Sequence, residues 1–227
     1  MPIQRGYRDA CGIAQALDLI GERWALLVVR ELLLGPKRFN DLHRGLPAAS
    51  PNALTDRLRE LSAAGIVRKR RQPPTNTWVY ELTDWGHRLE PIVISLGDWA
   101  LLSPLPDADE HLSTDSLMLT VRTYYSPRTT GRSGQLEVAL GDDNGGHQFG
   151  VWLQGDGVDV RHEVPPNADA VVRAPTAVGL SATFGDRAQL RSALDNGTVR
   201  IDGDKALGRH LLTSIVLPDP LPFSARR

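Results

Sequence analysis

The sequence predicts an α+β fold in two domains. In residues 1–102, helical apolar spacing dominates and leads into a basic two-stranded hairpin. From residue 114 to residue 227, strand patterns come first and helical patterns follow, which indicates a mixed sheet with helices on one face. The stretch 103–113, which contains prolines and several acids, is predicted to be a linker. The 227 residues are enough for two domains of ordinary size.

The helix predicted to begin at Pro51 organises the first half. Ser50 can accept a hydrogen bond from the first turn, and proline costs nothing at the first helical position. The spacing of an amphipathic helix then places one set of residues on a single side, namely Leu54, Leu58, Leu61 and Gly65. Polar side chains fall on the opposite side, at Asn52, Asp56 and Arg59. The helix therefore buries leucines and displays polar groups.

A hairpin is predicted directly after this helix. Residues 66–71 include four consecutive basic residues, 78–82 form the returning strand, and 72–76 make a polar tip. The major groove of DNA admits one helix, and cations along a ribbon can bind adjacent phosphates. The alternative is that the basic hairpin is a solvated edge that resists aggregation.

Three shorter helices are predicted ahead of this segment, at residues 9–20, 23–34 and 38–45. The second is almost continuously apolar, ends at Gly35-Pro36 and is expected to be buried. Together with the helix at Pro51 and the hairpin, these elements predict a winged helix-turn-helix domain.

A longer helix, capped by Thr83, is predicted to reach Trp99, with Pro91 kinking or shifting its first turn. Its apolar stripe has no obvious partner within the three-helix core. This stripe and the first helix predict pairing with a second copy of the chain; the alternative is that the stripe packs on its own domain.

The distribution of charge favours nucleic-acid contact in the first half. Residues 1–100 carry 14 Lys and Arg against 11 Asp and Glu, whereas the remainder carries 12 against 16. No apolar run has the length of a membrane span, and the start lacks an apolar signal segment, so we expect a cytoplasmic protein without a membrane partner. The single cysteine, Cys11, excludes a disulfide within the chain.

The polar face of the Pro51 helix and the hairpin supply the candidate DNA contacts. Asn can bind adenine, Arg guanine, and a carboxylate can accept from cytosine, whereas cations on the hairpin and before the third helix are expected to bind phosphate. The predicted DNA-binding residues are Lys37, Arg38, Ser50, Asn52, Thr55, Asp56, Arg57, Arg59, Arg70, Arg71, Thr75 and Asn76.

Residues 7–100 resemble the HxlR-type branch of the winged-helix regulators, which is related to the MarR type. The matching segments are Cys11, GERW at 21–24, ELLLGPKRFNDL at 31–42, SPNALTDRLRELSAAGIVRKR at 50–70, VYELTDWGHRLEPI at 79–92, and Trp99. The resemblance implies a homodimer joined through the first and last helices of the domain, with each Ser50 helix in the major groove and each wing near the minor groove of operator DNA.

In the second half, the patterns predict strands at residues 117–125, 135–140, 149–153, 158–164, 170–174 and 198–201, and helices at 176–183, 186–195 and 205–215. The closing segment NGTVRIDGDKALGRHLL, residues 196–212, resembles the end of the sterol carrier protein type two domain. That family has a five-stranded sheet and an apolar tunnel for hydrophobic ligands. A pocket of this kind would use Phe149, Trp152, Leu180, Phe184, Leu190, Leu194 and Leu211, although ordinary core packing explains the same residues.

Signatures of catalysis are missing from the sequence. The six histidines lack metal-binding spacing, and there is no GxSxG elbow, phosphate loop or GxGxxG after a strand. We therefore expect no enzyme activity, no metal and no cofactor. Cys11 has two interpretations: a redox switch, as in some members of the HxlR-type family, or a small residue packed at a helix start.

These observations lead to one main hypothesis and two alternatives. The main hypothesis is a homodimeric transcriptional regulator whose C-terminal domain binds a hydrophobic effector. The first alternative is a regulator that senses oxidants or electrophiles through Cys11 and has a purely structural C-terminal domain. The second is a lipid-binding carrier or enzyme that the N-terminal half tethers to DNA.

Overall fold

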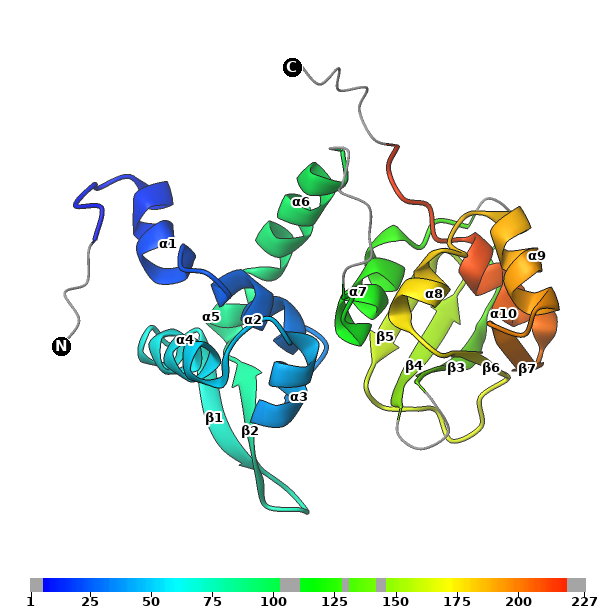
Figure 1. Ribbon diagram of the computed structural model, residues 1–227, viewed down its shortest axis with the longest axis horizontal. Helices are drawn as coiled ribbons and strands as arrows, with labels where there is room; N and C mark the ends of the chain where they lie inside the picture. The colour runs from blue at the N-terminus through cyan, green and yellow to red at the C-terminus, as the bar shows by residue number, and fades with distance from the viewer. Residues whose placement is uncertain (1–5, 103–110, 128–130, 142–145, 220–227) are drawn as a thin grey trace. The chain divides into compact units, whose positions relative to one another are not determined.

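The chain forms two compact units, Met1–Ser95 and Leu96–Arg227. The structure, a computed structural model, describes residues 6–102, 111–127, 131–141 and 146–219 (Figure 1). The first unit contains helices and one hairpin, and the second contains a separate mixed sheet, so the predicted α+β class is confirmed. Most of the predicted linker, residues 103–110, lies outside the described residues.

The first unit begins with the helices predicted from the sequence. They are α1 (Gly12–Ile20), α2 (Ala25–Leu32), α3 (Phe39–Gly45) and α4 (Pro51–Ala63). The second helix is shorter than the expected range 23–34, because Trp24 has a left-handed φ of 75° and α2 starts after it. Val28 and Val29 of α2 are buried together with Leu42, Leu54 and Leu58. The core of this unit thus lies where α2, α3 and α4 meet.

The hairpin consists of β1 (Val67–Gln72) and β2 (Thr77–Leu82), paired antiparallel. A short addition to it was not predicted from the sequence. The backbone N–H of Lys37 donates to the carbonyl of Tyr80 at 2.9 Å, and the N–H of Tyr80 donates back to Lys37 at 2.8 Å. This isolated bridge fastens the segment before α3 to the hairpin and fixes how α3 enters the domain.

The single helix predicted from Thr83 to Trp99 is two helices, α5 (Asp84–His87) and α6 (Glu90–Leu101). Thr83 does cap the first, because its hydroxyl accepts from the N–H of Gly86 at 3.0 Å. Pro91 has no N–H to continue the hydrogen-bond series of α5, so the helix breaks before it and α6 begins anew. Pro91 was predicted only to kink or shift the first turn of one helix, whereas the structure has two separate helices.

The second unit has a five-stranded mixed sheet with the order β5-β4-β3-β6-β7. Only β3 and β6 are parallel neighbours; the other pairs are antiparallel. The strands are β3 (Gly134–Leu140), β4 (His147–Gln154), β5 (Gly157–Arg161), β6 (Ala170–Ala174) and β7 (Arg200–Gly203). All five lie in or next to the predicted strand segments, although β7 is two residues later than its predicted start at 198.

Helices cover one face of this sheet (Figure 1). They are α7 (Thr114–Tyr124), α8 (Ala177–Ser181), α9 (Arg187–Asp195) and α10 (Lys205–Thr213). Along β3, Leu136 and Val138 are buried, whereas the alternating residues Gln135 and Glu137 are not. This alternation is expected for a sheet with one packed face and one open face.

The strand predicted at residues 117–125 is wrong, because residues 117–124 belong to helix α7 and Tyr125 directly follows it. Ser113, which was predicted to lie in the linker, caps the helix by accepting from the N–H of Ser116 at 3.1 Å. Leu117, Met118 and Val121 are buried on one side of the helix. The β-branched and aromatic residues suggested a strand, but the cap and burial at helical spacing decide the conformation.

Among the described residues, none of the helices has both the length and the apolar character that are needed to cross a membrane.

Candidate nucleic-acid interface

Helix α4 presents a polar face at the surface of the first unit. The Ser50 hydroxyl accepts from the N–H of Ala53 at 3.2 Å, which confirms the predicted cap. Leu54, Leu58 and Leu61 are buried, so the opposite side of the helix is turned to solvent. After the helix, Gly65 adopts a left-handed conformation with a φ of 73°. This conformation ends the helix and directs the chain into β1. Helices α3 and α4 with their connecting turn form the helix-turn-helix.

The polar residues of α4 differ in how freely they can reach a ligand. Asp56 and Arg59 are exposed and form an ion pair across one turn, with 2.9 Å between Arg59 Nη2 and Asp56 Oδ1. Arg57 is turned towards the domain: its side chain is only 13% exposed and is paired with Glu22 and Glu60. Asn52, Asp56 and Arg59 are therefore available on the outer face, whereas Arg57 is engaged within the unit.

The hydroxyl of the remaining candidate on α4, Thr55, donates to the carbonyl of Pro51 at 2.8 Å. This bond to the preceding turn takes up the hydroxyl proton, so the hydroxyl oxygen is what Thr55 can still offer to a ligand.

On one face of the hairpin, the cations are neutralised by a carboxylate of the same hairpin. The Nε atoms of Arg68 and Arg70 each lie 2.7 Å from a carboxylate oxygen of Glu81. Partial burial would raise the pKa of Glu81, but hydrogen bonds and charge from Arg70 and Arg68 outweigh it and lower that pKa below its usual value. Arg70, a predicted phosphate contact, thus already has an internal carboxylate partner.

The other face of the hairpin carries cations stacked on aromatic rings. Lys69 Nζ lies 5.3 Å from the centroid of the Trp78 ring and 5.4 Å from that of Tyr80, and the Arg71 guanidinium lies 4.6 Å from Trp78. Trp78 is 49% exposed. Such stacking orients a cation without neutralising its charge. Lys69 and Trp78 were not among the residues predicted from the sequence, although strand alternation places Lys69 and Arg71 on one face.

The tip of the hairpin is closed by polar contacts. Arg71 Nη1 donates to the carbonyl of Asn76 at 3.0 Å, and the hydroxyls of Thr75 and Thr77 lie 2.9 Å apart. Asn76 has a φ of 54°, the left-handed conformation that asparagine tolerates in tight turns. The tip therefore holds Arg71 in place and keeps Thr75 and Asn76 at the surface.

Lys37 does not lie at the surface, where a phosphate contact was predicted. The residue is only 6% exposed, and its Nζ lies 2.6 Å from Oε2 of the fully buried Glu31. Arg30 binds the other oxygen of Glu31 at 2.8 Å. The predicted contact of Lys37 with phosphate is therefore replaced by an internal ion pair between α2 and the segment before α3. Arg38, its neighbour, is exposed at the start of α3.

Two further candidate sites were predicted outside the DNA-binding elements, and the first is Cys11. This residue is exposed and directly precedes α1. The backbone N–H groups of Ile13 and Ala14 lower the pKa of its thiol below the ordinary value. No group of three or more His, Cys, Asp or Glu able to hold a metal ion occurs in the described part of the chain.

The second is the predicted apolar pocket of the C-terminal unit, whose seven residues do not form one lining. Phe149, Leu180, Phe184 and Leu211 are buried in the core. Trp152 and Phe149 lie on opposite faces of the sheet, because they are three positions apart on the regular strand β4, and Trp152 stacks with Arg161 at 5.1 Å.

Leu190 and Leu194, the remaining two, line a cavity of about 490 Å³ with residues of α9 and α10.

Comparison with known proteins identifies the first unit. Residues 19–103 match the family model described as HxlR-like helix-turn-helix. The uncharacterized HTH-type transcriptional regulator YybR of Bacillus subtilis is 37% identical over 94 residues, which are 40% of this chain and 74% of YybR. The HTH-type transcriptional regulator YodB of the same species is 36% identical over 86 residues, which are 37% of this chain and 77% of YodB.

Among solved structures, the reduced form of YodB from B. subtilis is 33% identical and covers 40% of this chain and 92% of its own, with a TM-score of 0.37. The sequence relationship covers the helix-turn-helix and the hairpin, at an identity and coverage that mark common descent. The chain belongs to the HxlR-like helix-turn-helix family of transcriptional regulators.

Proposed function

We propose that this regulator binds operator DNA as a homodimer and that a small hydrophobic molecule in its C-terminal unit changes its DNA affinity. Two surface features together carry the proposal. Helix α4 has an exposed row of polar side chains. One face of the hairpin has cations that stack on Trp78 and have no carboxylate partner among the described residues. This combination offers groups for base edges and groups for phosphates.

Helix α4 supplies the contacts that select sequence. With its first turns in the major groove, Asn52 can form paired hydrogen bonds with adenine, and Asp56 can accept from cytosine. Arg59 can bind guanine if it exchanges its exposed ion pair with Asp56 for a base edge. An exposed pair is weak, so DNA can compete for Arg59.

The hairpin and its surroundings supply the contacts that position the protein. Lys69 and Arg71 are the strongest candidates for phosphate binding, because their charges are held on the Trp78 face. Arg38, Ser50, Thr75 and Asn76 are exposed and can add weaker contacts. Arg70 contributes less, because Glu81 already binds it.

Exposed apolar side chains on α1 and α6 support the dimer. Ile13 and Leu17 of α1 are exposed, and α6 has no buried residue; its Ile92, Leu96 and Trp99 are 51%, 48% and 70% exposed. Large apolar side chains gathered on helices commonly mark a protein interface. A second copy of the chain that covers these helices would give the twofold symmetry expected of a regulator that binds two half-sites.

The C-terminal unit is the proposed effector domain. An effector can shift the dimer between states only if it binds them with different affinities. The unit has its own sheet and core, and a cavity lies between α9 and α10. These features support binding of a small molecule there, separate from the DNA contacts of α4 and the hairpin.

The test is the affinity of the full chain for the region upstream of its own gene, measured by fluorescence anisotropy at two salt concentrations with competitor DNA. We expect specific binding that weakens steeply with salt. R71Q should weaken it and should lower the slope of log affinity against log salt by about one for each phosphate that the variant no longer binds. R68Q is the matched control, because Arg68 is neutralised by Glu81, and it should change binding less. Equal effects of R71Q and R68Q would contradict the assignment of the two hairpin faces.

A second candidate function is supported by Cys11. Its exposed thiol, with a pKa lowered by the N–H groups of Ile13 and Ala14, suits a sensor of electrophiles. Treatment with a quinone or diamide would then release DNA from the wild type but not from C11S. Release from both proteins, or from neither, would reject this function.

A further inference from the structure

The cavity between α9 and α10 combines apolar and cationic side chains. It is partly open to solvent and has a volume of about 490 Å³, within the range of small-molecule sites. The residues that line it are Arg187, Leu190, Arg191, Leu194, Asp195, Arg209, His210 and Thr213. Three guanidinium groups and one carboxylate make the lining positive. This composition differs from that of the wholly apolar pocket predicted from the sequence.

The three arginines have no ion-pair partner among the described residues. Elsewhere in this unit Arg161 is paired with Asp159 and Arg173 with Asp202, so these two exposed arginines are already neutralised. Arg187 and Arg191 are instead one turn apart on α9, where like charges repel each other. A bound anion would relieve this repulsion.

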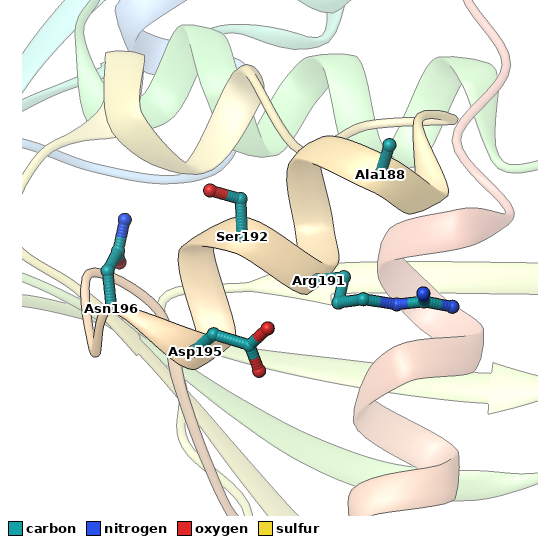
Figure 2. Close-up of a pocket in the computed structure, with 5 residues that line it drawn as sticks. All are labelled: Ala188, Arg191, Ser192, Asp195 and Asn196. Atoms are coloured by element: carbon teal, nitrogen blue, oxygen red, sulfur yellow. The ribbon is translucent and has the colours of Figure 1, made fainter.

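The orientation of the Arg191 side chain indicates that α9 and α10 contribute cations to the same site. Figure 2 shows α9 from the side, with the Arg191 side chain extending towards α10, whereas Ser192 and Asn196 lie elsewhere around the helix. The open depression drawn there is lined by Ala188, Arg191, Ser192, Asp195 and Asn196. Arg191 and Asp195 thus border both this depression and the cavity, and Arg191 reaches the side on which α10 contributes Arg209.

The apolar part of the lining comes from successive turns of α9. Leu190 is buried and Leu194 is half-buried, and their spacing of four residues places them side by side on the helix. A ligand that fills the cavity therefore meets an apolar wall as well as guanidinium groups. Arginine binds carboxylates through two parallel hydrogen bonds, which adds direction to the electrostatic attraction.

His210 adds no positive charge to the cavity. Its Nε2 lies 3.0 Å from the Tyr125 hydroxyl and accepts from the backbone N–H of Arg132 at 3.4 Å. Burial and the nearby charge of Arg132 lower the pKa of His210 below its usual value, so the ring is neutral near pH 7. The cation count of the cavity is then set by Arg187, Arg191 and Arg209.

We propose that this cavity binds a small amphipathic carboxylate, whose anionic group is held by Arg191 and Arg209 with support from Arg187, and whose apolar part packs on Leu190 and Leu194. This inference rests on the proposed function in one respect: it gives the chemical class of the effector that the C-terminal unit is proposed to bind. The site itself is defined by α9 and α10 and needs no contact with DNA.

The experiment is a calorimetric titration of the full chain with 2-naphthoate and with its uncharged counterpart 2-naphthamide. Naphthoate should bind saturably at one site per chain, and naphthamide should bind at least about tenfold more weakly, because the amide cannot form charge-assisted hydrogen bonds with the arginines. R191Q and R209Q should each lower naphthoate affinity about tenfold. The matched control is R173Q, because Arg173 is exposed but paired with Asp202 on the sheet, and it should leave the affinity unchanged.

Three outcomes would overturn the proposal: no binding of naphthoate, equal binding of naphthoate and naphthamide, or unchanged affinity in both R191Q and R209Q. Circular dichroism checks that the variants fold, and R187Q, with a smaller expected decrease in affinity, provides an independent test. Operator binding is measured separately, without ligand. Failure of the proposed function would appear as absent operator binding with an intact naphthoate titration, whereas failure of this inference would leave operator binding in place.

Discussion

Among the described residues, both units of this chain contain neutralised and unpaired cationic side chains, but the unpaired ones lie in different surroundings. In the first unit, Lys37 is neutralised by Glu31, Arg59 by Asp56, and Arg70 by Glu81. On the hairpin, the cations without a carboxylate partner among the described residues lie on the Trp78 face. In the second unit, three arginines of α9 and α10 surround a cavity without an ion-pair partner in the described part of the chain. The number of basic residues therefore indicates an anion site less reliably than the absence of their internal partners.

The largest effect should come from breaking the buried ion pair of the first unit. E31Q leaves Lys37 buried beside a neutral amide, and the removal of one partner of a buried pair typically costs about 3–5 kcal/mol. We expect the free energy of unfolding of the first unit to fall by about this amount, measured by urea denaturation. The matched control is D41N, which breaks the exposed pair of Asp41 with Arg44 and should cost less than about 1 kcal/mol. Equal decreases in both variants would show that burial does not strengthen the first pair.

The space around the same carboxylate gives the second prediction. A methyl group at Gly45 would overlap Glu31 Oε2, and Lys37 holds that oxygen so that it cannot swing away. G45A should therefore cost about 1–3 kcal/mol of unfolding free energy, despite the higher helix propensity of alanine. G12A is the control, because nothing lies within 4 Å of the added carbon at Gly12. A G45A protein as stable as wild type would mean that the Glu31 carboxylate can shift.

The third prediction concerns the exposed pair on α4. If Arg59 leaves Asp56 to bind a guanine, R59A should cost about 1–3 kcal/mol at the operator and relax specificity at that position. R59K retains the charge but cannot bind a base through two hydrogen bonds. Reduced discrimination in both variants, seen in anisotropy titrations with mutated operators, would support base contact. Full specificity in R59K would assign Arg59 to phosphate instead, and unchanged affinity in R59A would remove it from the interface.

The smallest expected effect is a dependence of the second unit on pH. Because the pKa of His210 is lowered in the folded state, the unfolded chain binds a proton there more readily. The contribution of His210 to stability is complete above its unfolded pKa, about 6.5, and is lost as the pH falls through the folded pKa. Thermal melts between pH 7.5 and 5 should show a steeper decline in wild type than in H210Q. Parallel curves would indicate that His210 titrates alike in both states.

Local sequence signals were sufficient for much of the fold. Ser50 and Pro51 define the start of α4, and the leucine spacing defines its buried face, because both depend on neighbours within four residues. The hairpins were predicted equally well, since their turns and alternation are local. Helix α7 was missed because its residues have strand propensity; the local cap at Ser113 was overlooked, and the burial of Leu117 and Val121 within the folded unit is not visible in the sequence.

The sequence by itself determined the helix-turn-helix, the hairpin and which polar residues face outward on α4. Only the tertiary structure decided which charges are free, because a partner distant in sequence changes what a residue can do. Glu31 withdraws Lys37 from the surface, and Glu81 occupies Arg68 and Arg70 across the hairpin. The arginines of α9 and α10 became a candidate site only when folding brought the two helices together without a carboxylate for each cation. The sequence shows which residues are charged, but whether a charge is neutralised depends on its distance from an opposite charge in the folded chain.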